Sequence, residues 1–217
     1  MTKPENSQPL RIAVLISGSG RTLKNFIDLE NTGELPVDIC LVISSAPEAG
    51  GLQHARKAGI SSLVFQRSSY PAGDPGPEPY SADIFSACRE AQVDYGVMAG
   101  FLKYVPIPKD FEQRVLNIHP SLIPEFCGHG MYGHHVHTAV LQQGAKVTGC
   151  TVHFADNIYD HGPILWQQSV PVHDDDTSET LADRVFTAEL EAYPKVLRLL
   201  AANQLEIEGR PVRTARS

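Results

Sequence analysis

The amino-acid sequence predicts a single α/β domain built on a doubly wound, mostly parallel sheet with helices on both faces. The chain has 217 residues, which is enough for one core of this kind. Apolar runs of strand length alternate with amphipathic segments of helical period along its N-terminal half. The connectors between these segments are short, so the alternation indicates right-handed βαβ units.

The N-terminal half supplies this alternation element by element. The apolar run at residues 10–16 is typical of a strand that is buried on both faces of a parallel sheet. A glycine-rich turn follows, and apolar residues at helical spacing predict a helix over residues 21–29. The same reasoning predicts the remaining elements of this half, at residues 37–44 (strand), 48–58 (helix), 62–65 (strand), 81–91 (helix) and 95–99 (strand).

The C-terminal half is less regular but contains the clearest helix. Residues 68–79 hold four prolines and two glycines, which predicts a surface loop without regular structure inserted within the domain. Strands are expected at residues 115–118 and 146–154. Asp176 and Glu179 are predicted to form the capping box of the last helix. One apolar face of that helix is marked by Leu181, Val185, Ala188, Ala192, Val196 and Leu200.

Composition and the chain ends exclude several classes of protein. Residues 1–9 are expected to be disordered and residues 206–217 to form a flexible tail, which leaves residues 10–205 as one domain. The polar start lacks the pattern of a secretory signal, so a cytoplasmic protein is expected. No apolar run approaches the length of about 18 residues that a membrane span needs. A net charge of −7 argues against nucleic-acid and membrane partners.

The turn after the first strand is a candidate phosphate site. Gly18 and Gly20 allow backbone N–H groups to approach an anion at the start of the next helix. A dinucleotide fingerprint needs a third glycine where Leu23 stands, and the lysine of a P-loop is absent. The turn is therefore either a site for one phosphate, with Arg21 and Thr22 as further donors, or a tight turn without a ligand.

Three residues of the C-terminal half suit chemistry at a carbonyl group. On a strand, Asn117 and His119 point to the same face, and Pro120 keeps His119 extended. An amide donor beside an imidazole can bind the oxygen that becomes negative when a carbonyl is attacked. Asp160, in a turn that ends in Gly-Pro, can orient the imidazole and organise a water that carries protons. Alternatively, these groups satisfy buried backbone atoms or form the turn.

Seven of the nine histidines lie between His119 and His161, which raises the question of a metal. On a helix, only His134 and His137 of the central group share a face. A catalytic zinc needs three protein ligands, and no HExxH pattern is present. We therefore expect no metal, and expect these histidines to line a pocket or to lie on the surface. The four scattered cysteines have no CxxC spacing and are given no catalytic role.

These motifs together resemble those of the folate-dependent formyltransferases, most closely the glycinamide ribonucleotide transformylases. The resemblance runs from Arg11 to about Leu200. It rests on six motifs in the same order, namely ISGSG at 16–20, AGFLK at 99–103, NIHPSLIP at 117–124, VHF at 152–154, DHGP at 160–163 and ELEAYP at 189–194.

The resemblance implies a Rossmann-like fold that transfers a formyl group from 10-formyltetrahydrofolate to the amine of glycinamide ribonucleotide in purine biosynthesis. It implies small-molecule substrates, no metal, and a monomer or homodimer. The catalytic residues would be Asn117, His119 and Asp160. The substrate contacts would come from Gly20, Arg21 and Thr22 (phosphate), Glu189 (ribonucleotide), and Leu102, Lys103, Val105 and Asn157 (folate).

The chain departs from the family pattern in places, and related activities remain as alternatives. Arg21 and Thr22 stand where the family often has Ser-Asn, and His161 stands where glycine is more usual. The glycine-rich stretch at 126–133 is longer than in well-known members. A formyltetrahydrofolate hydrolase or a sugar-nucleotide formyltransferase would share the chemistry, but those families usually carry an additional domain. A non-catalytic nucleotide-binding module is the remote alternative.

Overall fold

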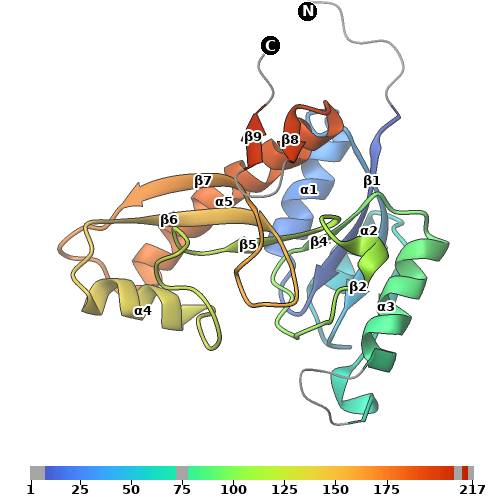
Figure 1. Cartoon of the computed structure of the whole chain (residues 1–217), viewed down its shortest axis with the longest axis horizontal. Helices are drawn as coiled ribbons and strands as arrows, with labels where there is room; N and C mark the ends of the chain where they lie inside the picture. The colour runs from blue at the N-terminus through green and yellow to red at the C-terminus, as the bar shows by residue number, and fades with distance from the viewer. Residues whose placement is uncertain (1–7, 72–77, 208–211, 215–217) are drawn as a thin grey trace, which may run out of the picture.

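The computed structural model describes residues 8–71, 78–207 and 212–214, and its centre is one seven-stranded sheet (Figure 1). The strand order is β3-β2-β1-β4-β5-β6-β7. The first five of these strands pair in parallel, whereas β6 and β7 pair antiparallel. The bounds are β1 (Leu10–Ile16), β2 (Val37–Ser44), β3 (Ser62–Val64), β4 (Tyr95–Met98), β5 (Val115–His119), β6 (Val147–Phe154) and β7 (Ile164–Pro171).

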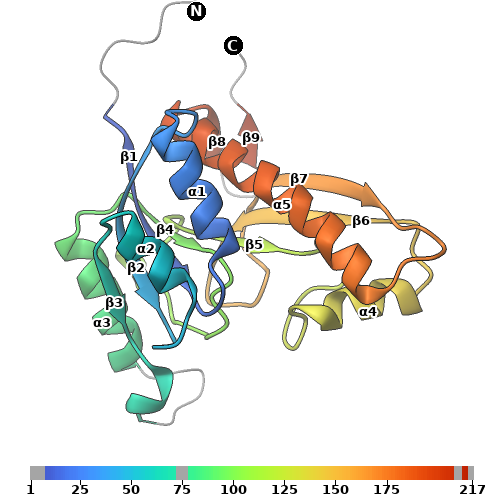
Figure 2. The ribbon, with the colours of Figure 1, turned by 180° about the vertical axis from the view of Figure 1, so that it is seen from behind.

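Helices cover both faces of the sheet, as predicted. Their bounds are α1 (Arg21–Asn31), α2 (Gly51–Lys57), α3 (Glu78–Glu90), α4 (His134–Gln142) and α5 (Ser178–Ala201). Figure 2 shows α1 and α5 on the same side of the sheet. Successive residues of β1 enter different cores: Val14 packs in the core that contains α1 and α5, and Leu15 in the core that contains α3. This alternation explains why the whole run from Ile12 to Ile16 is buried.

The order of the strands creates a crevice at one edge of the sheet. From β1 the chain passes outward to β2 and β3, and α3 then returns it to β4, which pairs with the opposite side of β1. The connections that leave β1 and β4 therefore diverge at the carboxyl ends of these strands. Open α/β sheets bind ligands in such a crevice. The segments at 17–22 and 99–105, both expected to contact substrates, follow these two strands directly.

The predicted strands and helices of the N-terminal half are confirmed within a few residues at their ends. The helix expected over residues 48–58 is shorter, since α2 spans Gly51–Lys57. The prediction of irregular structure over residues 68–79 was wrong at both ends, because a short 3₁₀ helix spans Arg67–Ser69 and α3 already begins at Glu78. Pro79 lies in the first turn of α3, where a missing N–H costs no helical hydrogen bond. Residues 72–77 of that segment lie outside the described residues.

The C-terminal half shows larger differences. α4 and β7 were not predicted, and the capping box of α5 consists of Thr177 and Thr180 rather than Asp176 and Glu179. Asp176 instead pairs with Arg184, 2.6 Å away. Two short paired strands, β8 (Leu205–Ile207) and β9 (Val212–Thr214), lie at the start of and within the tail that is expected to be flexible.

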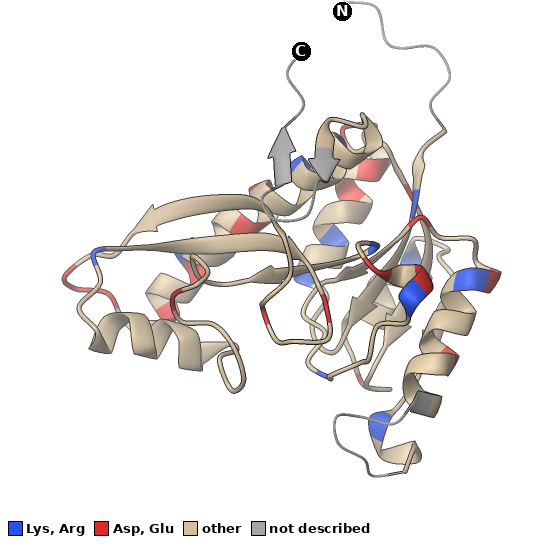
Figure 3. Ribbon diagram, viewed as in Figure 1, with Lys and Arg blue, Asp and Glu red and all other residues tan. Residues whose placement is uncertain are grey.

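The expected disordered start, the absence of a membrane span and the distribution of charge concern the chain as a whole. Residues 1–7 of the expected disordered start lie outside the part of the chain that the structure describes. Among the described residues, no helix is long and apolar enough to cross a membrane. Lys and Arg are interspersed with Asp and Glu on the helices other than α4 in the view of Figure 3. β6 and β7 contain none of these four residue types, so the charges near their junction come from the connecting turn.

Candidate active site

A cavity of about 740 Å³ occupies the crevice at the carboxyl ends of β1, β4 and β5. It brings together segments that are far apart in the sequence: the turn after β1, the loop after β4, the end of β5, the turn between β6 and β7, and one face of α5. All but one of the predicted site residues line it, namely Gly20, Arg21, Thr22, Leu102, Lys103, Val105, Asn117, His119, Asp160 and Glu189.

Asn157 is the exception, because it does not line the cavity. Its Oδ1 accepts a hydrogen bond from the backbone N–H of Ile107 at 2.7 Å, and its Nδ2 donates to the Ile107 carbonyl at 3.2 Å. The side chain therefore ties the turn between β6 and β7 to the loop that follows β4. Its structural position favours a bracing role over direct contact with a substrate.

His119 is held so that only one edge of its ring is available to a ligand. The residue ends β5 and is 3% exposed. Its Nε2 lies 2.8 Å from the carbonyl oxygen of Phe126, which can only accept, so Nε2 carries a proton. The opposite nitrogen, Nδ1, lies 3.4 Å from Oδ2 of Asp160. The Nδ1 edge is thus the one that can serve both the carboxylate and a substrate.

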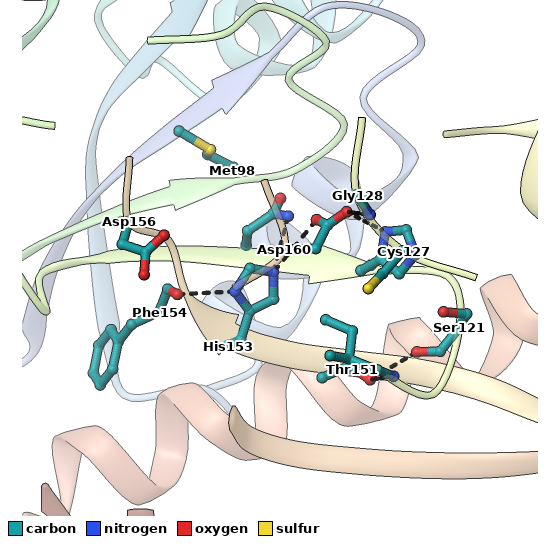
Figure 4. Close-up of polar contacts among 12 residues, drawn as sticks. Met98, Ser121, Cys127, Gly128, Thr151, His153, Phe154, Asp156 and Asp160 are labelled. Carbon is teal, nitrogen blue, oxygen red and sulfur yellow. Dashed lines mark hydrogen bonds and ion pairs between the residues drawn. The ribbon is translucent and has the colours of Figure 1, made fainter. Parts of the chain in front are cut away.

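The turn between β6 and β7 fixes the carboxylate of Asp160. Oδ2 accepts a hydrogen bond from the backbone N–H of Gly128 at 2.9 Å, a contact visible in Figure 4. The backbone of Asp160 has φ 51°, in the left-handed region. Gly162 packs so closely against the carbonyl of Phe154 that a Cβ would clash with it. The glycine of the Gly-Pro pair therefore allows the tight path that presents Asp160 to His119.

The turn after β1 has the geometry of an anion cradle. Gly20 has φ 72° and precedes α1, an eleven-residue helix whose N-terminus faces the cavity. A Cβ at Gly20 would clash with the backbone of Gly51, so close packing against α2 requires glycine here. Free N–H groups at the start of a helix attract anions. Thr22 is buried, whereas Arg21 is exposed at the cavity wall.

α5 contributes two features to the same wall. The guanidinium of Arg21 lies 3.8 Å from the ring centroid of Phe186 and 3.9 Å from Oδ1 of Asp183. Stacking on the ring orients the guanidinium at the cavity wall, where its N–H groups can meet an anion. Burial raises the pKa of Glu189 to about 8, and the charge of Arg21 offsets part of this shift. The acid can therefore offer a neutral or ionised carboxyl group near neutral pH.

The loop after β4 gives the cavity its apolar wall. Val105 is buried, whereas Leu102 is 64% exposed. The backbone N–H of Leu102 donates to Oγ of Ser17 at 2.8 Å, which anchors the loop to the end of β1. The ring of Tyr104 lies 5.3 Å from that of Tyr159. A large exposed apolar side chain beside aromatic rings suits a flat heterocycle.

The histidine cluster separates into residues with different environments. His134, His135 and His137 lie on α4, and only His137 is buried. Its pKa is lowered to about 4 by burial, with smaller contributions from His134 and His119, so it is neutral at pH 7. No group of three or more His, Cys, Asp or Glu side chains suited to a metal ion occurs among the residues that the structure describes.

One residue of the site was missed in the sequence. His153, on β6, is 1% exposed and lines the cavity beside Asn117. Its Nε2 lies 3.2 Å from Nδ2 of Asn117 and 3.8 Å from Oδ1 of Asp160. The sequence signal for His153 was its place in the strand predicted at residues 146–154, whose residues point alternately to the two faces of the sheet. Strand register, which the sequence does not reveal, was needed to place it opposite Asn117.

Comparisons with known proteins identify the group of proteins that share this arrangement. The sequence pattern of the formyl transferase family matches residues 10–197. The chain is 36% identical to phosphoribosylglycinamide formyltransferase, chloroplastic, from Vigna unguiculata over 90% of its own length, and spans 62% of that protein. It is 38% identical to a segment of the trifunctional purine biosynthetic protein adenosine-3 from Drosophila melanogaster, 14% of which it spans.

Solved structures match nearly the whole of this chain. The crystal structure of glycinamide ribonucleotide transformylase 1 from Symbiobacterium toebii superimposes with a TM-score of 0.88 at 38% identity, covering 97% of this chain and 96% of that chain. A formyltetrahydrofolate deformylase from Pseudomonas syringae pv. tomato gives a TM-score of 0.84 at 22% identity, covering 97% of this chain and 67% of that chain. The second likeness extends to the fold alone.

Proposed function

Because the chain belongs to the formyl transferase family, we propose that it transfers the formyl group of 10-formyltetrahydrofolate to the primary amine of glycinamide ribonucleotide. The observation that carries this proposal is the meeting of Asn117, His119 and Asp160 at one end of a cavity that also contains an anion cradle and an apolar wall. A formyl donor and a phosphorylated amine can therefore be held with their reacting atoms side by side.

The ribonucleotide is proposed to occupy the side of the cavity between α1 and α5. Its phosphate would contact the backbone N–H groups of Gly20 to Thr22 and the guanidinium of Arg21. The carboxyl group of Glu189, which lines the same side, is suited to accept hydrogen bonds from ribose hydroxyls. Together these groups would leave the amine pointing toward the end of β5.

The folate is proposed to lie along the loop after β4. Leu102, Lys103 and Val105 supply apolar contacts and one cationic side chain, and all three line the cavity. Asn157 contributes by keeping this loop fixed to the turn that carries Asp160. The formyl group would then lie between the Nδ1 edge of His119 and the amide of Asn117.

The chemical step is a transfer between two nitrogens. The neutral amine attacks the formyl carbon, a C–N bond forms, and the carbonyl electron pair moves to oxygen. Asn117 donates a hydrogen bond to this oxyanion, and the imidazolium form of His119 stabilises it electrostatically. The oxyanion then collapses and the bond to folate N10 breaks. The proton lost by the amine reaches that nitrogen through the groups around Asp160.

Holding both substrates in one cavity removes much of the entropic cost of their encounter. The amine is already a nucleophile when neutral, so no group of the protein has to generate one. What the protein must supply is orientation, exclusion of competing water, and stabilisation of one developing negative charge. The burial of His119 places that stabilising group where the local dielectric constant is low.

The decisive experiment measures products with three acceptors. Purified protein is incubated with 10-formyltetrahydrofolate and either glycinamide ribonucleotide, an amino-sugar nucleotide or buffer alone, and products are identified by mass spectrometry. We expect formylated glycinamide ribonucleotide in equal amount to released tetrahydrofolate. Formate release at the same rate in buffer alone would indicate a hydrolase, and formylation of the sugar nucleotide would indicate another acceptor. Absence of any turnover would indicate a non-catalytic nucleotide-binding module.

The acidic composition and the small cavity support small-molecule substrates without a nucleic-acid or membrane partner. A cytoplasmic location, as a monomer or homodimer, belongs to the same proposal. Light scattering coupled to size-exclusion chromatography measures the oligomeric state, and a mass above that of two chains would contradict it.

A further inference from the structure

His153 has no part in the mechanism above, yet it faces the catalytic amide directly. The antiparallel register of β5 and β6 pairs Asn117 with His153 and His119 with Thr151. Side chains directly opposite one another in such a pair lie on the same face of the sheet. The imidazole of His153 is 1% exposed, so its hydrogen bonds with neighbouring protein groups determine its state.

The hydrogen bonds of His153 determine which ring nitrogen carries the proton. Its Nδ1 lies 2.8 Å from the backbone carbonyl oxygen of Phe154, a contact that is drawn as a dashed line in Figure 4. A carbonyl oxygen can only accept, so Nδ1 carries a proton. In the neutral ring Nε2 is then an acceptor. The group beside it is the amide of Asn117, with 3.2 Å between the two nitrogens.

The charged form of His153 is disfavoured by its surroundings. Burial lowers the pKa of this ring, and His119 acts in the same direction. The hydrogen bond to Phe154 opposes this effect, as do Asp160 and Asp156, but together they do not overcome it. The nearer carboxylate oxygen, Oδ1 of Asp160, is 3.8 Å from Nε2, which is beyond hydrogen-bond distance. Nε2 is therefore an unprotonated acceptor that requires a donor from Asn117.

We propose that His153 is a positioning residue, which fixes the amide of Asn117 so that one N–H binds Nε2 and the other points to the formyl oxygen. An asparagine amide can turn by 180° and exchange its oxygen and nitrogen. In the turned orientation, the amide oxygen would meet the lone pair of Nε2, and the developing oxyanion would lose its donor. The assignment rests on the proposed formyl transfer.

Two substitutions of similar size separate this role from simple packing. In His153→Asn, the amide NH₂ can take the place of Nδ1–H, but the acceptor at Nε2 is lost. In His153→Gln, the longer side chain can bring its oxygen to the position of Nε2. We expect His153→Asn to lower kcat about 100-fold, as loss of an oxyanion donor does. KM for either substrate should change less than about threefold.

His153→Gln should recover at least about tenfold of that loss, since it restores the acceptor. In an Asn117→Ala background, His153→Asn should cost less than about threefold, because the amide it orients is already absent. Equal losses in the two His153 variants, near-wild-type turnover of His153→Asn, or additive losses with Asn117→Ala would overturn the assignment. Circular dichroism and thermal melting identify any variant that fails to fold.

A measurement on the wild-type protein keeps the proposal testable if the variants do not fold. Nitrogen-15 NMR of the histidine rings at pH 7 distinguishes the two neutral tautomers and the imidazolium form. We expect His153 to be neutral with its proton on Nδ1. An imidazolium ring or a proton on Nε2 would overturn the proposal. This spectrum does not depend on turnover, so it also distinguishes failure of this assignment from failure of the proposed formyl transfer.

Discussion

Oδ2 of Asp160 lies 3.4 Å from Nδ1 of His119 and accepts the backbone N–H of Gly128 at 2.9 Å. The carboxylate reaches this position from the turn between β6 and β7, while the imidazole comes from the end of β5. A side chain that is 10% exposed would be costly to ionise without such partners. The proposed chemistry depends on this pair.

Asp160→Asn tests whether this charge drives turnover. The amide has nearly the same shape but cannot support the imidazolium form of His119, so we expect kcat to fall about 100-fold or more. Folate binding, measured by fluorescence titration, should change little. Asp156→Asn is the matched control, since its carboxylate pairs with the exposed ring of His161 at 2.8 Å. Near-wild-type turnover in folded Asp160→Asn would remove this carboxylate from the mechanism.

Arg21→Met tests the anion site. Loss of a charged hydrogen-bond donor to phosphate should raise KM for glycinamide ribonucleotide roughly tenfold or more and leave KM for the folate nearly unchanged. Lys24→Met on the same helix removes an equal charge that is paired with Asp28 at 2.5 Å. It should have a much smaller effect on either KM. An equal rise in KM for both substrates in Arg21→Met would indicate that the phosphate binds elsewhere.

Glu189→Gln tests the half-buried acid of the cavity wall through protein stability. The native pKa is about 8, against an ordinary value of 4.5, so the folded protein retains a proton that the unfolded chain releases. The stability contributed by protonated Glu189 is complete below about pH 4.5 and is lost as the pH rises through 8. Glutamine cannot ionise, so the variant should melt about 3 °C or more above wild type at pH 8.5.

The same difference should shrink toward zero as the pH falls toward 4.5. Melting curves across this range make the comparison, with Glu191→Gln, an exposed acid on the same helix, as the control. A difference in melting temperature that is independent of pH would contradict a raised pKa at Glu189.

Chelation tests whether activity depends on a metal ion held by the histidine cluster. A zinc hydrolase needs its ion to lower the pKa of bound water toward about 7. The proposed transfer uses an amine instead, so dialysis against a strong chelator should leave activity intact. His134→Ala and His137→Ala should each reduce turnover much less than His119→Ala does. Loss of activity on dialysis and its recovery with zinc would contradict a metal-free mechanism.

The sequence predicted most of the sheet because buried parallel strands are continuous apolar runs with short connectors. It could not predict the position of α4, nor β7, where ILWQQSVP groups its apolar and polar residues instead of alternating them. Local capping was also misassigned, since Thr177 and Thr180 form the capping box and Asp176 pairs with Arg184. Long-range ion pairs of this kind leave no local signal.

In the candidate site, too, the features with a local sequence signal were predicted and those that depend on tertiary contacts were not. Asn117, His119 and Asp160 could be named from motif chemistry, and they line one cavity. The role of Gly20 could not be seen in full, because the close approach of Gly51 from α2 is a tertiary contact. His153 was missed because its significance depends on the register between β5 and β6. The bracing contacts of Asn157 likewise join residues fifty positions apart.

The central claim is that His119 stabilises the transition state of formyl transfer. Single-turnover measurement with enzyme in excess over 10-formyltetrahydrofolate, in the presence of saturating glycinamide ribonucleotide, isolates this step from binding and product release. For His119→Ala we predict a rate constant at least about 100-fold below wild type, with dissociation constants for both substrates within about threefold. An unchanged single-turnover rate constant in the folded variant would contradict the account.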